Sequence, residues 1–99
     1  MWILNSSDEG DEALTFRLSP GAIKTVGRAA GADLVVEAAL VSRLHCRLEA
    51  GDEMLTVVDL ESTNGTYVNG GRVATAHLLP GDRLKVGRVE FQVGRADAG

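Results

Sequence analysis

Hydrophobic and polar residues alternate with a period of two along much of this chain. The alternation is clearest in residues 14–18, 83–86 and 89–93, where every second side chain is apolar. Such a pattern predicts β-strands with one buried face. Residues 54–58 instead form a nearly continuous apolar run rich in β-branched side chains. This run predicts a strand that is covered on both faces.

Turn-forming residues separate these segments. Gly, Pro, Asn and Asp recur about every ten residues, as expected for many short strands in a sandwich or barrel. The one helical candidate, residues 31–40, lacks a capping box and a sustained helical period, so we predict a short strand at 34–36 and then a loop. The main turn signals lie at residues 19–21, 50–52, 64–65, 69–71, 80–82 and 87–88.

Length and charge narrow the class of protein. The 99 residues predict a single domain, with a core in residues 2–93 and a frayed tail at 94–99. The net charge is −4, and an acidic stretch without basic partners at residues 8–12 predicts an acidic hairpin loop. The basic residues are scattered along the chain, which argues against general nucleic-acid binding.

The cysteine content and the hydropathy of the chain indicate in which cellular compartment we expect it. The single cysteine, Cys46, excludes an internal disulfide, and its phase with Leu48 predicts a small core residue. No apolar run approaches the ~18 residues of a membrane span, and no secretory signal opens the chain. We therefore expect a monomer in the cytoplasm without membrane contact, unless a longer parent protein sets the location.

The first of three motifs is Val26-Gly27-Arg28, at a predicted strand end. Glycine at position 27 permits either a close backbone approach or an unusual φ. The Arg28 guanidinium is a fixed fork of donors that suits phosphate or carboxylate oxygens. The alternative is that Arg28 pairs with Asp33 or Glu37, and this motif alone favours that alternative.

The second motif, Ser42-Arg43-Leu44-His45, precedes a predicted strand. Ser42 offers a hydroxyl and an N–H, Arg43 adds charge, and successive loop amides can form an anion-binding concavity. His45 could act as a base or a metal ligand. No cysteine or second histidine lies at ligand spacing, however, since His77 is far along the chain. We therefore favour a structural His45 that ties one loop to another, and we predict no metal site.

The third motif, residues 62–70 (STNGTYVNG), is the most specific. Its two Asn-Gly pairs predict tight hairpin turns on either side of residues 66–68. Hydrogen bonds to the local backbone could account for the hydroxyl groups. Ser62, Thr63 and Asn64, however, place three side-chain donors at one loop tip, which is more than a turn needs. Phosphate binding explains all three motifs together.

In this order and spacing, the motifs resemble the signature of the forkhead-associated (FHA) family, small modules that bind phosphothreonine peptides. The resemblance extends over nearly the whole chain, and Asp59-Leu60 and residues 79–82 fit the same pattern. It implies an all-β fold, a β-sandwich of about eleven short strands with the binding loops at one end.

The resemblance also implies roles for single residues. By position, Arg28, Ser42 and Thr63 match residues that contact the phosphate in such domains. Arg43 matches a position at the edge of the phosphate or peptide, and Asn64 matches one that holds the peptide backbone. The positions that match loop-shaping residues are Gly27, His45, Gly65 and Asn69.

These implications predict a non-catalytic reader of phosphothreonine on protein partners in kinase-dependent signalling, without a cofactor. The loops around residues 37–41 and Arg88 are expected to set the preference for the residue three beyond the phosphothreonine. The alternative function is an interaction scaffold that uses the same fold without phosphate. An enzyme finds no support, because Ser42 and His45 lack an orienting acid.

Overall fold

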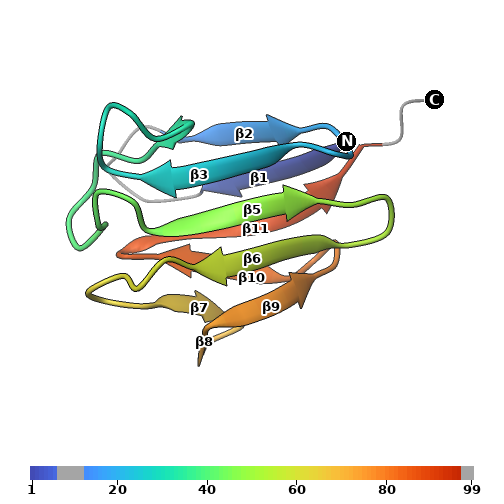
Figure 1. Ribbon diagram of the computed structural model, residues 1–99. Helices are drawn as coiled ribbons and strands as arrows, with labels where there is room; N and C mark the ends of the chain where they lie inside the picture. The colour runs from blue at the N-terminus through green and yellow to red at the C-terminus, as the bar shows by residue number, and fades with distance from the viewer. Residues whose placement is uncertain (7–12, 97–99) are drawn as a thin grey trace.

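Two β-sheets packed face to face form the protein (Figure 1). The computed structural model describes residues 1–6 and 13–96, so the predicted acidic loop at 8–12 lies outside the described residues. Eleven strands and no helix occur in this part of the chain, which confirms the all-β sandwich. In the same ranges, no helix with the length and apolarity to cross a membrane is found.

Neighbouring strands run antiparallel, except that β3 and β4 form a short parallel pair. The short strand predicted at residues 34–36 is β4. In spatial order, the six-stranded sheet contains β2 (Thr15–Leu18), β1 (Trp2–Ser6), β11 (Val89–Arg95), β10 (Arg83–Val86), β7 (Thr66–Val68) and β8 (Gly71–Val73). The five-stranded sheet contains β4 (Leu34–Val35), β3 (Ile23–Gly27), β5 (Cys46–Ala50), β6 (Leu55–Asp59) and β9 (Thr75–Leu78).

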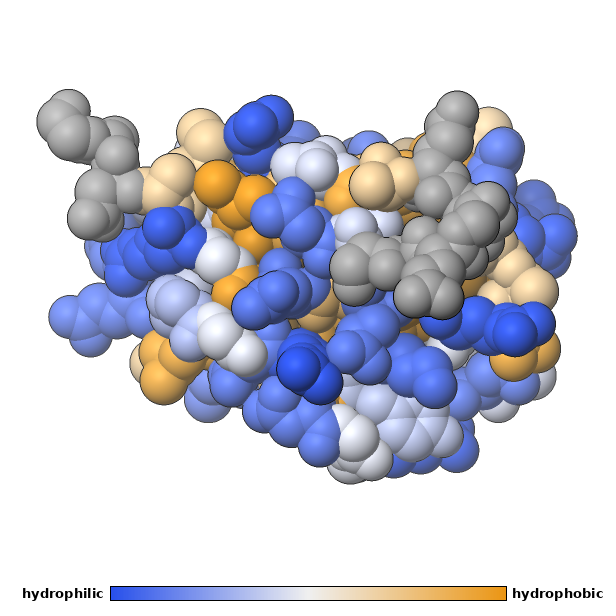
Figure 2. Space-filling view, turned by 180° about the vertical axis from the view of Figure 1, so that it is seen from behind, coloured by the Kyte–Doolittle hydropathy of each residue, from blue (hydrophilic) through white to orange (hydrophobic). Residues whose placement is uncertain are grey.

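Side chains alternate between core and solvent as the sequence predicts. On β11, Val89, Phe91 and Val93 are buried, whereas Glu90 and Gln92 are exposed. Figure 2 shows the outer face of the six-stranded sheet, where hydrophilic residues predominate. The period-two pattern thus places the apolar face of each strand between the two sheets.

The expectation for residues 54–58 is wrong for one face of the strand. Leu55 and Val57 are fully buried, but Met54 is 39% exposed and Val58 is only half-buried. Among the described residues no further layer covers the outer face of the five-stranded sheet, so every second side chain reaches solvent. A β-branched residue fits such a half-exposed pleated surface without lying in the core.

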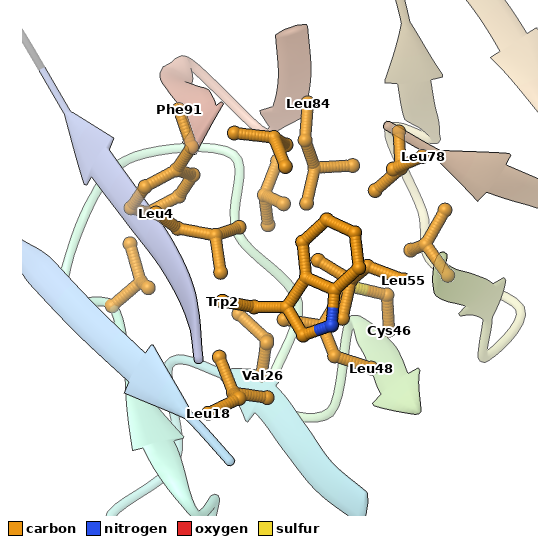
Figure 3. Packing of buried hydrophobic residues seen from close by; sticks show 14 of the residues in the cluster. Trp2, Leu4, Leu18, Val26, Cys46, Leu48, Leu55, Leu78, Leu84 and Phe91 are labelled. Atoms are coloured by element: carbon orange, nitrogen blue, oxygen red, sulfur yellow. The ribbon is translucent and has the colours of Figure 1, made fainter. Parts of the chain in front are cut away.

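The core between the sheets is built around Trp2 (Figure 3). Its side chain is fully buried, and the indole N–H donates a 2.8 Å hydrogen bond to Gly51 O. Cys46 is a fully buried core residue as predicted, and burial raises the pKa of its thiol to about 12. The labelled neighbours in Figure 3 are Leu4, Leu18, Val26, Leu48, Leu55, Leu78, Leu84 and Phe91.

The C-terminal strand is longer than the sequence suggests. We expected a frayed tail at residues 94–99, but Gly94 and Arg95 continue β11 and pair with Ile3 and Trp2. The guanidinium carbon of Arg95 also lies 4.9 Å from the centroid of the Trp2 ring, a cation–π contact. The expectation is therefore wrong for the first residues of the segment, and residues 97–99 lie outside the described residues.

The connections that carry the three motifs gather at one end of the sandwich, away from the N-terminus (Figure 1). They are the β3–β4, β4–β5 and β6–β7 loops, and the β10–β11 turn lies at the same end. Loops held by a rigid sheet scaffold are a common place for binding sites.

Candidate functional site

The residues that the resemblance assigns to peptide binding meet at one cavity of about 450 Å³. Its wall combines Arg28 from just after β3, residues 38–43 from the β4–β5 loop, and Thr63 and Asn64 from the β6–β7 loop. The volume is in the range of ligand pockets. All five predicted binding residues line this cavity, namely Arg28, Ser42, Arg43, Thr63 and Asn64.

The Arg28 guanidinium is anchored by a hydrogen bond and not by an ion pair. Its Nε donates to Val41 O at 3.2 Å, which leaves the two terminal nitrogens to donate to a ligand. Neither ion pair found in residues 1–6 and 13–96 involves Arg28 or Glu37. Asp33 instead accepts hydrogen bonds from the Thr25 N–H and hydroxyl, which hold the pKa of its carboxyl below the ordinary value.

Gly27 allows two backbone segments to touch. A Cβ atom at this position would lie only 2.0 Å from Arg43 O. The N–H groups of Arg28 and Ala29 donate to Ser42 O and Arg43 O at 2.9 and 3.1 Å. The residues after β3 therefore run directly against the β4–β5 loop, and close approach, not an unusual φ, is what requires glycine here.

His45 connects the β4–β5 and β6–β7 loops from the inside. Its side chain is fully buried, Nδ1 accepts a hydrogen bond from the Ser42 N–H at 3.0 Å, and Nε2 lies 2.8 Å from Gly65 O. Because a carbonyl oxygen only accepts, Nε2 carries the proton and donates it. The Ser42 N–H is thus occupied, so the expectation that it helps to form an anion-binding concavity is wrong.

Two more hydrogen bonds bridge the loops at the cavity. The Thr63 N–H donates to Ser42 Oγ at 3.0 Å, and Asn64 Nδ2 donates to Leu40 O at 3.2 Å. The hydroxyl proton of Ser42 remains able to donate to a ligand. The side chains of Thr63 and Asn64 are exposed, so the cavity presents guanidinium, hydroxyl and amide groups together.

Ser62 faces inward, so the expectation of three side-chain donors at one loop tip is wrong. Its buried hydroxyl donates to Asp59 Oδ1 at 2.6 Å and accepts from the Gly65 N–H at 3.0 Å. Thr66 Oγ1 donates to the same carboxylate oxygen at 2.7 Å. Burial raises the pKa of Asp59, but the hydrogen bonds from Ser62 and Thr66 outweigh it and hold that pKa below the ordinary value. The Asp59 carboxylate therefore anchors the base of the β6–β7 loop.

The two Asn-Gly pairs have different roles. Asn69 and Gly70, with φ values of 50° and 86°, form the predicted hairpin turn between β7 and β8. The Asn69 side chain accepts a 2.9 Å hydrogen bond from the Arg83 N–H, so it shapes this turn and not the cavity wall. Asn64 and Gly65 lie where the chain crosses from one sheet to the other, so the hairpin predicted there is wrong.

Sequence reasoning did not foresee the backbone conformation of Leu40. This residue lies in the cavity wall with a left-handed φ of 69°, which is uncommon for a residue other than glycine. Gly87 in the β10–β11 turn packs beneath it, because a Cβ there would lie 2.8 Å from Leu40 O. No glycine, asparagine or aspartate marks position 40, so the sequence carries no local signal for this conformation.

Comparison with known proteins identifies the family. A family model of the FHA domain matches residues 24–87, which include all three motifs and every residue of the cavity wall. The chain belongs to the FHA domain family. This membership agrees with the resemblance seen in the sequence and with the all-β sandwich.

Three individual similarities place this FHA domain among known proteins. It is 40% identical over 78 residues to the ABC transporter ATP-binding/permease protein Rv1747 of Mycobacterium tuberculosis, a match over 79% of the chain and 9% of that protein. The FHA domain of CT664 from Chlamydia trachomatis has the same fold, with a TM-score of 0.89, 24% identity, and coverage of 96% and 97% of the two chains. A structure from a study of phosphothreonine-dependent FHA domain interactions has a TM-score of 0.81, 28% identity, and 96% coverage of both chains.

Proposed function

We propose that this FHA domain is a non-catalytic module that binds phosphothreonine peptides of protein partners in kinase-dependent signalling. The observation that carries the proposal is the convergence of three separate chain segments on one cavity, with Arg28, Ser42 and Thr63 in its wall. The same three segments carry the sequence motifs, which supports a common ligand for them.

The chemistry of the cavity suits a phosphate monoester. A phosphothreonine carries about −1.5 to −2 charges at pH 7 and offers three strong acceptor oxygens. The terminal nitrogens of Arg28 can meet two of these oxygens as a fork, the arrangement that gives charge-assisted hydrogen bonds their strength. The hydroxyls of Ser42 and Thr63 add neutral donors, and Arg43 adds a second positive charge at the edge.

In the proposed complex, Asn64 binds the backbone of the peptide. Its Nδ2 is already bonded to Leu40 O, so the amide is held in place and its Oδ1 can accept from a peptide N–H. An amide fixed by its own loop contact loses little conformational entropy when a peptide binds. In the proposed complex, Asn64 therefore positions the peptide chain beside the phosphate-binding residues Arg28, Ser42 and Thr63.

The known relatives support a module with a partner-binding role. One similar structure comes from a study of phosphothreonine-dependent FHA interactions. The chain spans only 9% of the first curated relative, a much longer transport protein. For this chain we propose phosphopeptide recognition alone, and neither the transport activity nor the partners of that longer protein.

The test is a pair of calorimetric titrations with one peptide in phosphorylated and unphosphorylated form. The peptide is first selected from an oriented phosphothreonine library. We expect micromolar binding of the phosphorylated form, about −8 kcal/mol, and none of the other. Equal binding of both forms would favour the phosphate-independent scaffold and overturn the proposal.

A further inference from the structure

Three basic residues lie together on the outer face of the six-stranded sheet, outside the wall of the binding cavity. Arg83 and Lys85 are exposed on β10, and Arg72 is exposed on β8. Tyr67 of β7 pairs with Lys85 on one side and with Arg72 on the other. Residues directly opposite each other in a sheet point to the same face. Arg72, Lys85 and Arg83 therefore form a basic strip across three neighbouring strands.

The positive charge of the basic strip is only partly balanced. On the outward-facing positions of β7, β8, β10 and β11, the one acidic side chain is Glu90, opposite Lys85. Glu90 Oε1 lies 3.8 Å from Arg83 Nε, and the two side chains are 49% and 68% exposed, so this pair is weak. Neither ion pair within residues 1–6 and 13–96 uses Arg72 or Lys85. One carboxylate thus faces three cations.

The basic strip borders a hollow in the surface. A cavity of about 450 Å³ is lined by Asn69, Gly70, Arg83, Lys85 and Glu90. Its two cations and one side-chain amide can donate hydrogen bonds to carboxylate oxygens, and such charge-assisted bonds are stronger than neutral ones. No large apolar side chain lines this hollow. Its chemistry therefore suits an acidic segment and not an apolar one.

Arg72 connects the basic strip with the peptide-binding end of the sandwich. A Cβ on Gly65 would lie 2.8 Å from Arg72 Nε and 3.1 Å from Arg72 Cζ, so the guanidinium group packs over this glycine. Gly65 directly follows Asn64, which binds the peptide backbone in the proposed complex. A peptide that continues from Asn64 across Gly65 therefore reaches the first cation of the strip.

We propose that the basic strip binds an acidic segment of the same partner protein, separate from the phosphothreonine residue held in the cavity. This inference rests on the proposed function. The Asn69 N–H donates to Arg83 O at 2.9 Å, so Asn69 marks the far end of the strip. The chain from Asn64 to Asn69 spans at most about 18 Å, and an extended peptide advances about 3.3 Å per residue. The acidic side chains should therefore lie about three to eight residues from the phosphothreonine.

The experiment compares one phosphothreonine peptide with three kinds of extension. The core peptide selected from the library is extended, on one side or the other, by a run of Asp, Ser or Lys. Each peptide is titrated against wild type, the strip variant Arg83→Gln/Lys85→Gln and the control variant Arg17→Gln/Lys24→Gln. Both variants lose the same charge, and Arg17 and Lys24 are exposed on β2 and β3 and line neither cavity. Arg72 is left unchanged, because its packing could also position the β6–β7 loop.

In wild type at low salt, we expect Asp on one side to bind about fivefold more tightly than Ser, since several weak exposed ion pairs add together. Lys should bind more weakly than Ser, and added salt should reduce the gain from Asp. The strip variant should lower this gain to below about twofold, whereas the control variant should keep it. The Ser peptide should bind all three proteins alike. No gain in wild type, or an equal loss in both variants, overturns the strip while the proposed function stands.

Two further measurements separate the remaining outcomes. Binding of the core peptide by wild type that ignores phosphorylation would remove both proposals. Sedimentation detects self-association of wild type, and if the strip variant alone abolished it, the strip would bind a second copy of this chain and the partner assignment would be overturned. Thermal unfolding of each variant verifies that it is folded.

Discussion

His45 and Gly65 are joined by a 2.8 Å hydrogen bond between Nε2 and the carbonyl oxygen, although they belong to different binding loops. The other ring nitrogen of His45 accepts from the Ser42 N–H. The fully buried His45 side chain therefore fixes the spacing between the β4–β5 and β6–β7 loops, although it does not line the cavity itself. In this FHA domain, the geometry of the site depends on a buried residue outside the cavity wall.

The first prediction concerns this link. His45→Ala removes both hydrogen bonds and leaves the Ser42 N–H and the Gly65 carbonyl without their partners. An unsatisfied buried group costs about 1–3 kcal/mol, and the lost side chain adds a cavity. We expect the melting temperature to fall by about 10 °C or more, and peptide affinity to fall with it. Thermal unfolding and calorimetry measure the two effects. Unchanged stability with lost binding would instead make His45 a ligand contact.

The second prediction concerns the close approach at Gly27. A methyl group there would lie 2.0 Å from Arg43 O, so Gly27→Ala must push the β4–β5 loop away from β3. Overpacking of this kind costs about 1–3 kcal/mol, and the displaced loop should no longer hold Ser42 beside Arg28. Gly31→Ala is the control, because nothing lies within 4 Å of its Cβ position. Chemical unfolding and a peptide titration of both variants check the prediction, and equal behaviour would contradict it.

The third prediction concerns acid stability through Asp59. Its folded-state pKa lies below the ordinary value because Ser62 and Thr66 donate to the charged carboxylate, against the opposing effect of burial. Because the pKa of Asp59 is lower in the folded state, its carboxylate stabilises the fold at pH values above the unfolded-state pKa of about 3.9. This stabilisation is lost as pH falls through the folded pKa. We expect Asp59→Asn to reduce the free energy of unfolding at pH 7 by about 2 kcal/mol, and the difference from wild type to shrink below pH 4.

Asp33 provides the comparison for this measurement. Its pKa is also lowered, chiefly by the Thr25 N–H, but the carboxylate is exposed and does not line the cavity. Because Asp59 is intact in Asp33→Asn, the free energy of unfolding of this variant should still fall in acid as it does in wild type. Denaturant titrations of both variants across the acid range separate the two carboxylates. A wild-type-like profile for Asp59→Asn would exclude the proposed anchoring role.

The fourth prediction concerns Arg28. The guanidinium is exposed and bonded only through Nε to Val41 O, so little of the fold depends on its charge. Arg28→Ala should change the melting temperature by only a few degrees. It should weaken phosphopeptide binding by about 1.5–3 kcal/mol or more, because a charge-assisted contact to phosphate is lost. Arg17→Ala is the control, since Arg17 is exposed on β2 and does not line the cavity. Equal affinity of both variants would argue against a phosphate contact at Arg28.

The strands and the site residues differ in how far the sequence predicts them. Alternation on β11 follows directly from burial of one face, and the turn at Asn69 and Gly70 follows from their tolerance of positive φ. The inward direction of Ser62 depends on a short-range pairing with Asp59, three residues earlier, which the turn pattern alone does not distinguish from an outward-facing hydroxyl. The left-handed Leu40 instead depends on long-range contacts from two other loops. Local patterns predict the strands, whereas individual side-chain contacts decide which residues line the cavity.

The last prediction concerns the choice between phosphothreonine and phosphoserine. Burial of the extra methyl group is worth about 0.8 kcal/mol, roughly fourfold in affinity. A larger ratio must come from geometry, because the β-branched side chain of threonine restricts χ1 to fewer rotamers.

If Asn64 fixes the peptide backbone, one χ1 rotamer directs the phosphate to Arg28 and Ser42, and the more flexible phosphoserine loses more entropy on binding. Asn64→Ala should then weaken both peptides and narrow the gap between them, since a loosely held backbone lets either residue adapt. It also removes the hydrogen bond to Leu40 O, so thermal unfolding must accompany the paired titrations. A threonine-to-serine ratio that stays constant while both affinities fall would assign the discrimination to the methyl contact alone, and Asn64 would then have no part in it.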